Sequence, residues 1–192
     1  MPTFIGHAVT GIALSSIIFR KRQWLGIGIM SIFCSIGPDI DAIGFKLGIP
    51  YQHWLGHRGF SHSIIFAIAL GLMAFLFVHT KRIQNSWLLF GVLLSCGLVH
   101  DVLDAMTSGG LGVAFFSPLS ETRYFLPWRP IEVSPLILRR FLSHRGVGVM
   151  KSEFVWVMVP SLCFMVLTIW YRMGRRRRKT KRRLRNSILI SG

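Results

Sequence analysis

The chain has 192 residues, of which 52% are hydrophobic, and it carries a formal net charge of +16. So much apolar composition in a chain of one domain's length excludes an ordinary soluble globular protein and indicates a membrane protein. The three cysteines lie singly within apolar stretches, which excludes a disulfide framework and predicts small core residues.

Five apolar stretches follow one another along the chain, and each predicts a transmembrane helix. They are Phe4–Phe19, Trp24–Gly37, Ser63–Thr80, Trp87–Met106 and Phe154–Tyr171. Several are shorter than the roughly 20 residues that span a bilayer as a helix, which leaves room for polar groups at one end. Basic residues follow the first stretch instead of preceding it, so we expect that stretch to remain as a helix rather than to act as a signal peptide.

The connections between these stretches alternate in charge. Lys and Arg number 3 in the first connection, 2 in the third and 10 after Tyr171, which is 15 of the 23 in the chain, whereas all 7 acidic residues fall in or beside the other connections. The positive-inside rule therefore predicts an N-terminus outside and a C-terminus inside the cell. Because the net charge is mainly a topology signal, we expect no specific nucleic acid partner, and membrane lipids are the expected partners of the basic residues.

The connection Thr107–Glu153 is the longest in the chain. Its prolines, arginines and aromatic residues argue against a sixth spanning helix, so we expect a cap folded over the outer surface. The sequence thus predicts an all-α membrane protein of about five transmembrane helices, with a helical domain over residues 1–171 and a basic cytoplasmic tail over residues 172–192. The expected location is the inner membrane of a bacterium.

Histidines and aspartates gather at four places along this pattern. They are His7, the pair Asp39 and Asp41, the pair His57 and His62, and the group His100, Asp101 and Asp104. Counted from the basic boundary at about 1.5 Å per helical residue, one member or more of each group lies at a depth of roughly 20–28 Å, in the outer part of the apolar core. Isolated imidazoles and carboxylates are costly there, so the shared layer predicts a divalent metal site.

The spacing within these groups narrows their roles. His100 and Asp104 stand at i and i+4, so both project from one helical face and can bind the same ion, whereas Asp101 points elsewhere. Asp39 and Asp41 would place both carboxylates on one side only if the backbone there is extended. Otherwise one of the two supports the ligands from behind.

Each group also has an ordinary structural interpretation. A single intramembrane histidine such as His7 is more often a hydrogen-bonded packing residue than a ligand. The pair Asp39 and Asp41 could form a helix-capping turn, and Ser61 could cap the third helix. The metal hypothesis rests on the coincidence of all four groups at one depth.

The segments Gly6-His7, Pro38–Asp41, Gly56–Ser63 and His100-x-x-x-Asp104 resemble the YdjM family of membrane-bound metal-dependent hydrolases. The resemblance covers roughly residues 4–135, and Gly56–Ser63 is its most specific part. That family is similar in turn to zinc-dependent phospholipase C and related single-strand nucleases. The resemblance implies a phosphoester hydrolase with metal ligands at His7, Asp39 or Asp41, His57, His62, His100 and Asp104. No His-x-x-x-Asp or His-x-x-x-Glu follows Asp104, so a full trinuclear cluster is not implied.

The leading hypothesis is an inner-membrane hydrolase that acts from the periplasmic side on a phosphoester or lipid. The mixed nitrogen and oxygen ligands favour zinc, with manganese and iron as alternatives, and one or two ions would activate water and polarise the phosphoryl oxygen. Arg58 would stabilise the developing charge, and Asp41 or Asp101 could orient the water.

Two other classes of function compete with this hypothesis. One is a non-catalytic membrane protein, whose metal only holds the helices together or whose basic tail recruits a partner. The other is an ion carrier, which the apolar cytoplasmic halves of the helices disfavour.

Overall fold

The computed structural model describes residues 2–18, 23–79, 86–134 and 144–191. The basic connections Arg20–Arg22 and Lys81–Arg82, on which the topology prediction partly depends, lie outside these described residues. The helical elements, in chain order, are α1 (Phe4–Ser15) with η1 (Ser16–Ile18), α2 (Trp24–Ile36) with η2 (Gly37–Phe45), η3 (Phe60–His62) with α3 (Ile64–Val78), α4 (Ser86–Ala105), α6 (His144–Glu153), the π-helical turn η4 (Phe154–Met158) and α7 (Val159–Ser191).

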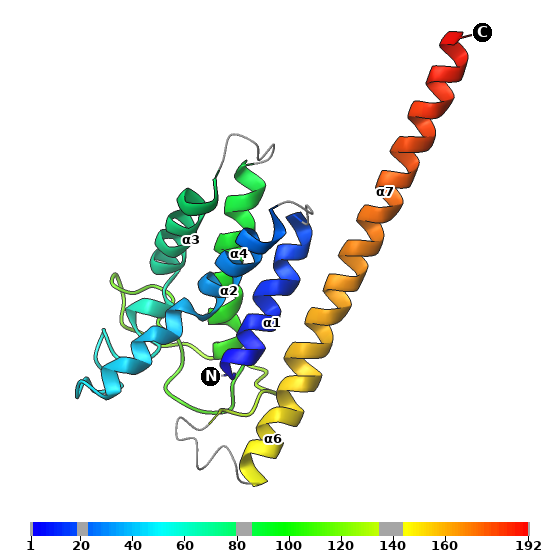
Figure 1. Ribbon diagram of the computed structural model, residues 1–192. Helices are drawn as coiled ribbons and strands as arrows, with labels where there is room; N and C mark the ends of the chain where they lie inside the picture. Colours follow the sequence, from blue (N-terminus) through cyan, green and yellow to red (C-terminus); the bar gives the residue numbers. More distant parts are fainter. Residues whose placement is uncertain (1, 19–22, 80–85, 135–143, 192) are drawn as a thin grey trace.

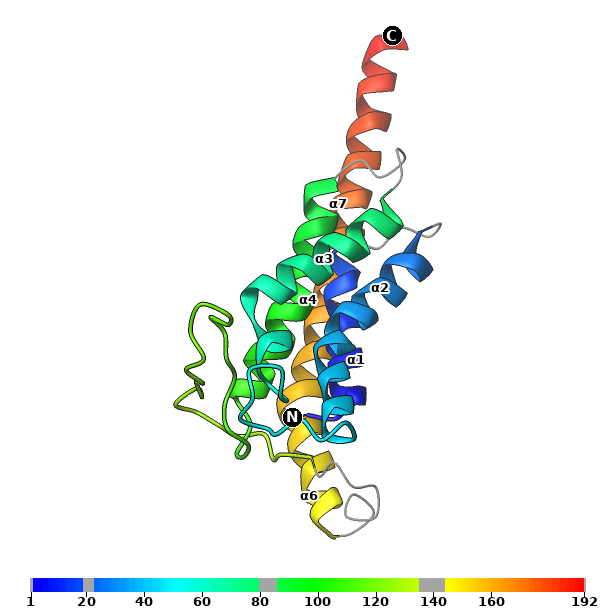
Figure 2. The ribbon, with the colours of Figure 1, turned by 90° about the vertical axis from the view of Figure 1, so that its left-hand side faces the viewer.

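The helices α1 to α4 lie side by side as an up-and-down bundle, and α6, η4 and α7 form one long rod along α1 (Figure 1). The view turned by 90° shows α7 continuing well beyond the other helices at the C-terminal end (Figure 2). Three helical segments, Trp24–Phe45, Ser86–Ala105 and Gly146–Arg176, are long and apolar enough to cross a membrane, and Phe4–Ile18 and Ile64–Val78 are shorter apolar helices. The prediction of an all-α membrane protein is confirmed, and the described residues contain no strand, only two isolated bridges.

Small residues let these helices approach closely, as is usual in membrane bundles. A Cβ atom added at Gly11 of α1 would lie 2.7 Å from the backbone oxygen of Ser31 in α2. Between α3 and α4, Gly71 packs in the same way against the backbone of Leu94. The apolar core between these closely packed helices includes Cys34 and Cys96, as predicted. Cys163, in contrast, is exposed on α7.

The last helix differs from the sequence prediction at its start. The apolar pattern begins at Phe154, but the rod already begins at His144. The His144–Glu153 segment is polar on average, so a search for apolar stretches passes over it. Because alternate helices run in opposite directions, the N-terminus of α1, the end of η2, the start of α3 and the end of α4 all meet at one end of the bundle.

Candidate metal centre

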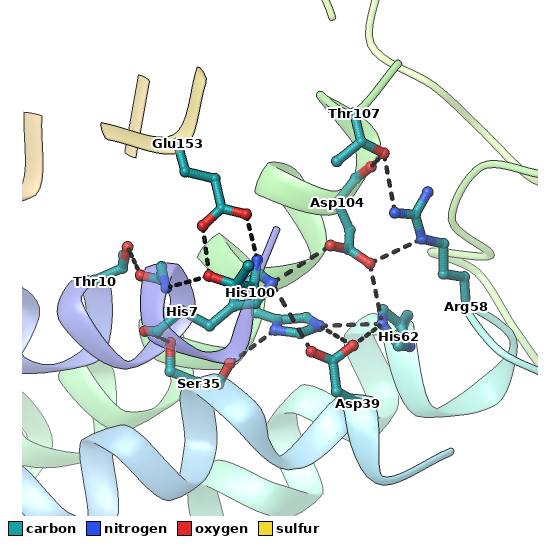
Figure 3. Close-up of polar contacts among 12 residues, drawn as sticks. His7, Thr10, Ser35, Asp39, Arg58, His62, His100, Asp104, Thr107 and Glu153 are labelled. Carbon is teal, nitrogen blue, oxygen red and sulfur yellow. Dashed lines mark hydrogen bonds and ion pairs between the residues drawn. The ribbon is translucent and has the colours of Figure 1, made fainter. Parts of the chain in front are cut away.

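Four segments bring histidines and aspartates to this end of the bundle, where the side chains point toward one another (Figure 3). They are His7, one turn into α1; Asp39 in η2; His62 at the end of η3; and His100 and Asp104 on α4. All five are at most 2% exposed. The Ser63 side chain caps α3 by accepting a hydrogen bond from the Phe66 amide at 3.1 Å, which fixes where η3 ends and thus where His62 lies.

Asp39, His62, His100 and Asp104 form an inner group whose ligand atoms are all within 4.8 Å of one another. His62 Nε2 lies 3.1 Å from His100 Nε2, 3.4 Å from Asp104 Oδ2 and 3.6 Å from Asp39 Oδ1. His100 Nε2 lies 3.7 Å from Asp39 Oδ1. Ligands held at about 2.0–2.1 Å from a tetrahedral zinc ion are roughly 3.3 Å apart, so these separations suit one shared ion.

The hydrogen bonds behind the two imidazoles support the same interpretation. His100 Nδ1 lies 2.8 Å from the backbone oxygen of Ser35, which can only accept, so Nδ1 carries the proton and the Nε2 lone pair faces inward. His62 Nδ1 lies 3.1 Å from Asp41 Oδ2, which leaves its Nε2 facing His100. Two facing lone pairs require a cation or a proton between them. This is how outer hydrogen bonds orient metal-binding histidines.

The pKa of His62 shows which charge the inner group favours at this position. Burial would lower the pKa of His62, but hydrogen bonds to Asp104, Asp39 and Asp41 outweigh burial and hold its pKa well above the usual value. The carboxylates therefore favour a positive charge at this point. A divalent cation supplies that charge and also satisfies the inward-facing atoms.

His7 lies beside the inner group as a further nitrogen donor. Its Nε2 is 3.5 Å from Asp104 Oδ1 and 4.0 Å from Asp39 Oδ2, and its ring centroid is 3.9 Å from that of His100. Both ring nitrogens of His7 and both carboxylate oxygens of Asp39 are buried without a hydrogen bond among the described residues. Buried polar atoms left in this state are expensive, and a metal ion would satisfy them.

Asp41 and His57 form an outer group around the second nitrogen of His62. Asp41 Oδ1 lies 2.6 Å from His57 Nδ1, and Asp41 Oδ2 accepts hydrogen bonds from the Ser61 hydroxyl and from the Arg58 amide at 3.1 Å. The backbone from Gly37 to Phe45 is a 3₁₀ helix, not an extended strand, so Asp39 and Asp41 point to different sides. Asp39 therefore joins the inner group, and Asp41 supports it from behind.

Arg58 ties the cluster to the long connection that covers it. Its Nε lies 2.9 Å from Asp104 Oδ2, and its Nη atoms donate to the Gly109 backbone oxygen at 3.1 Å and the Thr107 hydroxyl at 2.9 Å. The side chain is fully buried, and its backbone has a left-handed φ of 63°. A non-glycine residue in this region is uncommon and marks a position held by its surroundings.

The cap closes over the segment that carries His57 and His62. Arg123 donates to the backbone oxygens of His57 at 2.9 Å and Tyr51 at 3.0 Å. The Gly56–Ser63 segment beneath it is very tightly folded, because a Cβ atom at Gly59 would lie 2.2 Å from the Trp54 backbone oxygen. Only glycine fits such an approach. The cap predicted from the prolines and aromatic residues thus lies directly on the cluster.

Two further acidic residues lie outside both ligand groups, and one of them, Glu153, differs from the sequence prediction. Asp101 is buried and neither carboxylate oxygen has a hydrogen bond among the described residues, but it belongs to neither ligand group. Glu153, which the sequence placed in the outer loop, is fully buried and accepts hydrogen bonds from the Thr3 amide at 2.6 Å and the Thr3 hydroxyl at 2.5 Å. Because Thr3 is the N-cap of α1, Glu153 anchors the helix that carries His7.

A family model described as YdjM inner membrane protein matches residues 1–177. The chain belongs to the YdjM family. It is 35% identical over 180 residues to the inner membrane protein YbcI of Escherichia coli (strain K12), a match that covers 90% of this chain and 99% of that protein. No solved structure matches the chain. The assignment to the YdjM family drawn from the motifs is confirmed, and the YdjM match extends past residue 135 to include Glu153 and the whole candidate membrane span Gly146–Arg176.

Proposed function

We propose that this YdjM protein is a metal-dependent hydrolase of phosphoesters, with membrane lipids as one source of substrate. The observation that carries the proposal is the pair of inward-facing Nε2 atoms of His62 and His100, 3.1 Å apart and flanked by two carboxylates. Such a set of nitrogen and oxygen ligands suits zinc. The motif resemblance to phosphoester hydrolases supports the reaction class.

The proposed roles follow from the contacts of each side chain. Asp39, His62, His100 and Asp104 would hold the cation, with His7 as a further ligand. The cation would supply the Lewis acidity that activates a water molecule and polarises a phosphoryl oxygen.

Three residues are proposed to act around this cation. Arg58 orients Asp104 and still has N–H groups for an anionic oxygen, since its contacts among the described residues, to Asp104, Gly109 and Thr107, use three of its five donors. Asp41 orients His62, with His57 as its partner. Asp101, a buried carboxylate with no hydrogen bond to any residue that the structure describes, is the proposed proton acceptor.

A structural metal site is the second candidate, and one observation favours it. Asp39, His62, His100 and Asp104 are all at most 2% exposed, and closed sites are typical of structural zinc. In that case the ion would hold α2, α3 and α4 together at one end. Hydrolysis would then be absent although the metal is present.

The orientation in the membrane is proposed from charge alone. The excess of Lys and Arg in the connections at the other end of the helices supports a periplasmic position for the metal cluster. Reporter fusions test this orientation. A phosphatase reporter fused after Arg178 should be inactive and a fluorescent protein at the same point active, and the opposite pattern would reverse the orientation.

Metal analysis combined with a substrate screen tests the function. Protein purified without chelator should contain about one divalent ion per chain, and bis(p-nitrophenyl) phosphate and phosphatidylglycerol are the first substrates. His62→Ala should lose both metal and hydrolysis, whereas the exposed loop variant His53→Ala should keep both. Metal without any chelator-sensitive hydrolysis would favour the structural site, and absence of metal would remove both candidates.

A further inference from the structure

A second site lies at the opposite, basic end of the bundle, between η1, α4 and α7. It is a pocket of about 380 Å³. Ile17, Leu88 and Tyr171 supply apolar surface, and Thr168 lies among them. Arg172, Arg175 and Arg176 line the remaining wall. The pocket is therefore apolar on one side and strongly basic on the other.

Two arginine contacts, one between α7 and η1 and one within α7, shape the wall of this pocket. Arg172 donates to the backbone oxygens of Ser16, at 3.0 Å, and Ile17, where α1 and η1 end. This contact fixes α7 against α1. Arg175 lies over the ring of Tyr171, with its guanidinium carbon 5.9 Å from the ring centroid. Arg172 and Arg175 thus have defined contacts at the edge of the pocket.

Charge complementarity identifies the ligand as an anion. None of the chain's 7 acidic residues lines the pocket; they are Asp39, Asp41, Asp101, Asp104, Glu121, Glu132 and Glu153. No side chain that lines the pocket supplies negative charge, so a ligand that balances the arginines is an anion. Arginine pairs well with phosphate because its planar N–H groups match two phosphate oxygens.

The position of the pocket identifies the rest of the ligand. The span Gly146–Arg176 ends at the pocket, which places the arginines at the boundary where an apolar core meets head groups. We propose that the pocket binds one anionic phospholipid, with its phosphate between Arg175 and Arg176 and its glycerol and upper acyl chains against Leu88 and Ile17. A free phosphate ion would leave that apolar surface unused. This proposal does not depend on the metal site or on hydrolysis.

The test compares two pairs of arginines that carry the same charge. The protein is held in neutral dodecyl maltoside micelles with a small fraction of phosphatidylglycerol or phosphatidylcholine, and native mass spectrometry counts the retained lipid. Arg175→Gln/Arg176→Gln removes the pocket charge. Arg182→Gln/Arg183→Gln removes equal charge farther along the tail, and Thr168→Phe fills the pocket without changing charge.

The wild type should retain phosphatidylglycerol in preference to phosphatidylcholine. Arg175→Gln/Arg176→Gln and Thr168→Phe should each weaken phosphatidylglycerol binding by about tenfold or more, whereas Arg182→Gln/Arg183→Gln should stay within about twofold. Equal losses in both double variants would indicate diffuse attraction to the tail and overturn the proposal. Displacement of the lipid by millimolar inorganic phosphate would overturn the assignment to a lipid. Unchanged metal content and melting temperature in the variants would show that the cluster end is intact.

Discussion

The two ends of the helix bundle differ in whether their charged side chains are buried and paired or exposed. At one end, Asp39, His62 and Asp104 are buried, and each charged group faces an opposite partner. At the other end, Arg175 and Arg176 are exposed, and no acidic residue lies in the surrounding segments. A buried charge is tolerated only when it is compensated, whereas an exposed charge costs little by itself. Removal of one charge should therefore have very different consequences at the two ends.

The largest effect is expected for Asp104→Ala. This change removes a ligand and leaves Arg58 buried without its carboxylate partner, so the free energy of unfolding should fall by about 3–5 kcal/mol, with loss of the metal. The matched change at the other end, Arg175→Ala, should cost less than about 0.5 kcal/mol. Thermal unfolding in detergent and metal analysis measure both. Similar losses for the two variants would break the contrast between the ends.

A smaller effect is expected for Arg58→Ala. Asp104 then loses one charged partner but keeps the histidines and the cation, so the free energy of unfolding should fall by about 2 kcal/mol. Removal of the metal with a chelator should enlarge this loss, because Asp104 would then have lost two compensating charges. Arg123→Ala is the control and should not respond to the chelator, because it removes hydrogen bonds to backbone oxygens and a contact with the Tyr51 ring but no charged partner of Asp104. If chelation leaves the Arg58 variant unchanged, Arg58 and the cation do not share Asp104.

Among the changes at the cluster end, the smallest effect is expected for Glu153→Gln. Glutamine keeps an oxygen that can accept from Thr3 but loses the charge, so the loss should be about 1 kcal/mol and should fall on the first turn of α1. Hydrogen exchange of the amides near Gly6 should accelerate, with metal content unchanged. The exposed Glu121→Gln should leave exchange in α1 as it is. Uniform acceleration throughout the bundle would show that Glu153 acts globally instead.

Counting residues along each helix from its basic end was sufficient to predict which side chains form most of the cluster. His7, Asp39, His62, His100 and Asp104 were expected in one layer, and the structure brings them together. The same count would have found Glu153, which stands 19 residues before Arg172, had the last helix been extended past its apolar part.

Other parts of the site could not be predicted because they depend on the backbone conformation and on backbone contacts, which the pattern of side chains does not reveal. The roles of Asp39 and Asp41 stayed open because they depend on whether the backbone there is extended or 3₁₀. The Ser35 contact to His100 uses a backbone oxygen, which every residue type has. Likewise, the anchoring of Arg58 on Gly109 requires knowledge of where the cap folds back.

The π-helical turn Phe154–Met158 sets the rotational phase between the two ends of the last rod. Before it, Glu153 contacts Thr3 at the start of α1, and after it, Arg172 contacts Ser16 where α1 gives way to η1. A regular α-helix advances by about 100° per residue, so deletion of one residue within the turn would rotate one contact away from α1 relative to the other. This one wide turn therefore sets the rotation of α7 relative to α6, so that Glu153 and Arg172 both face the first helix although they lie far apart along the rod.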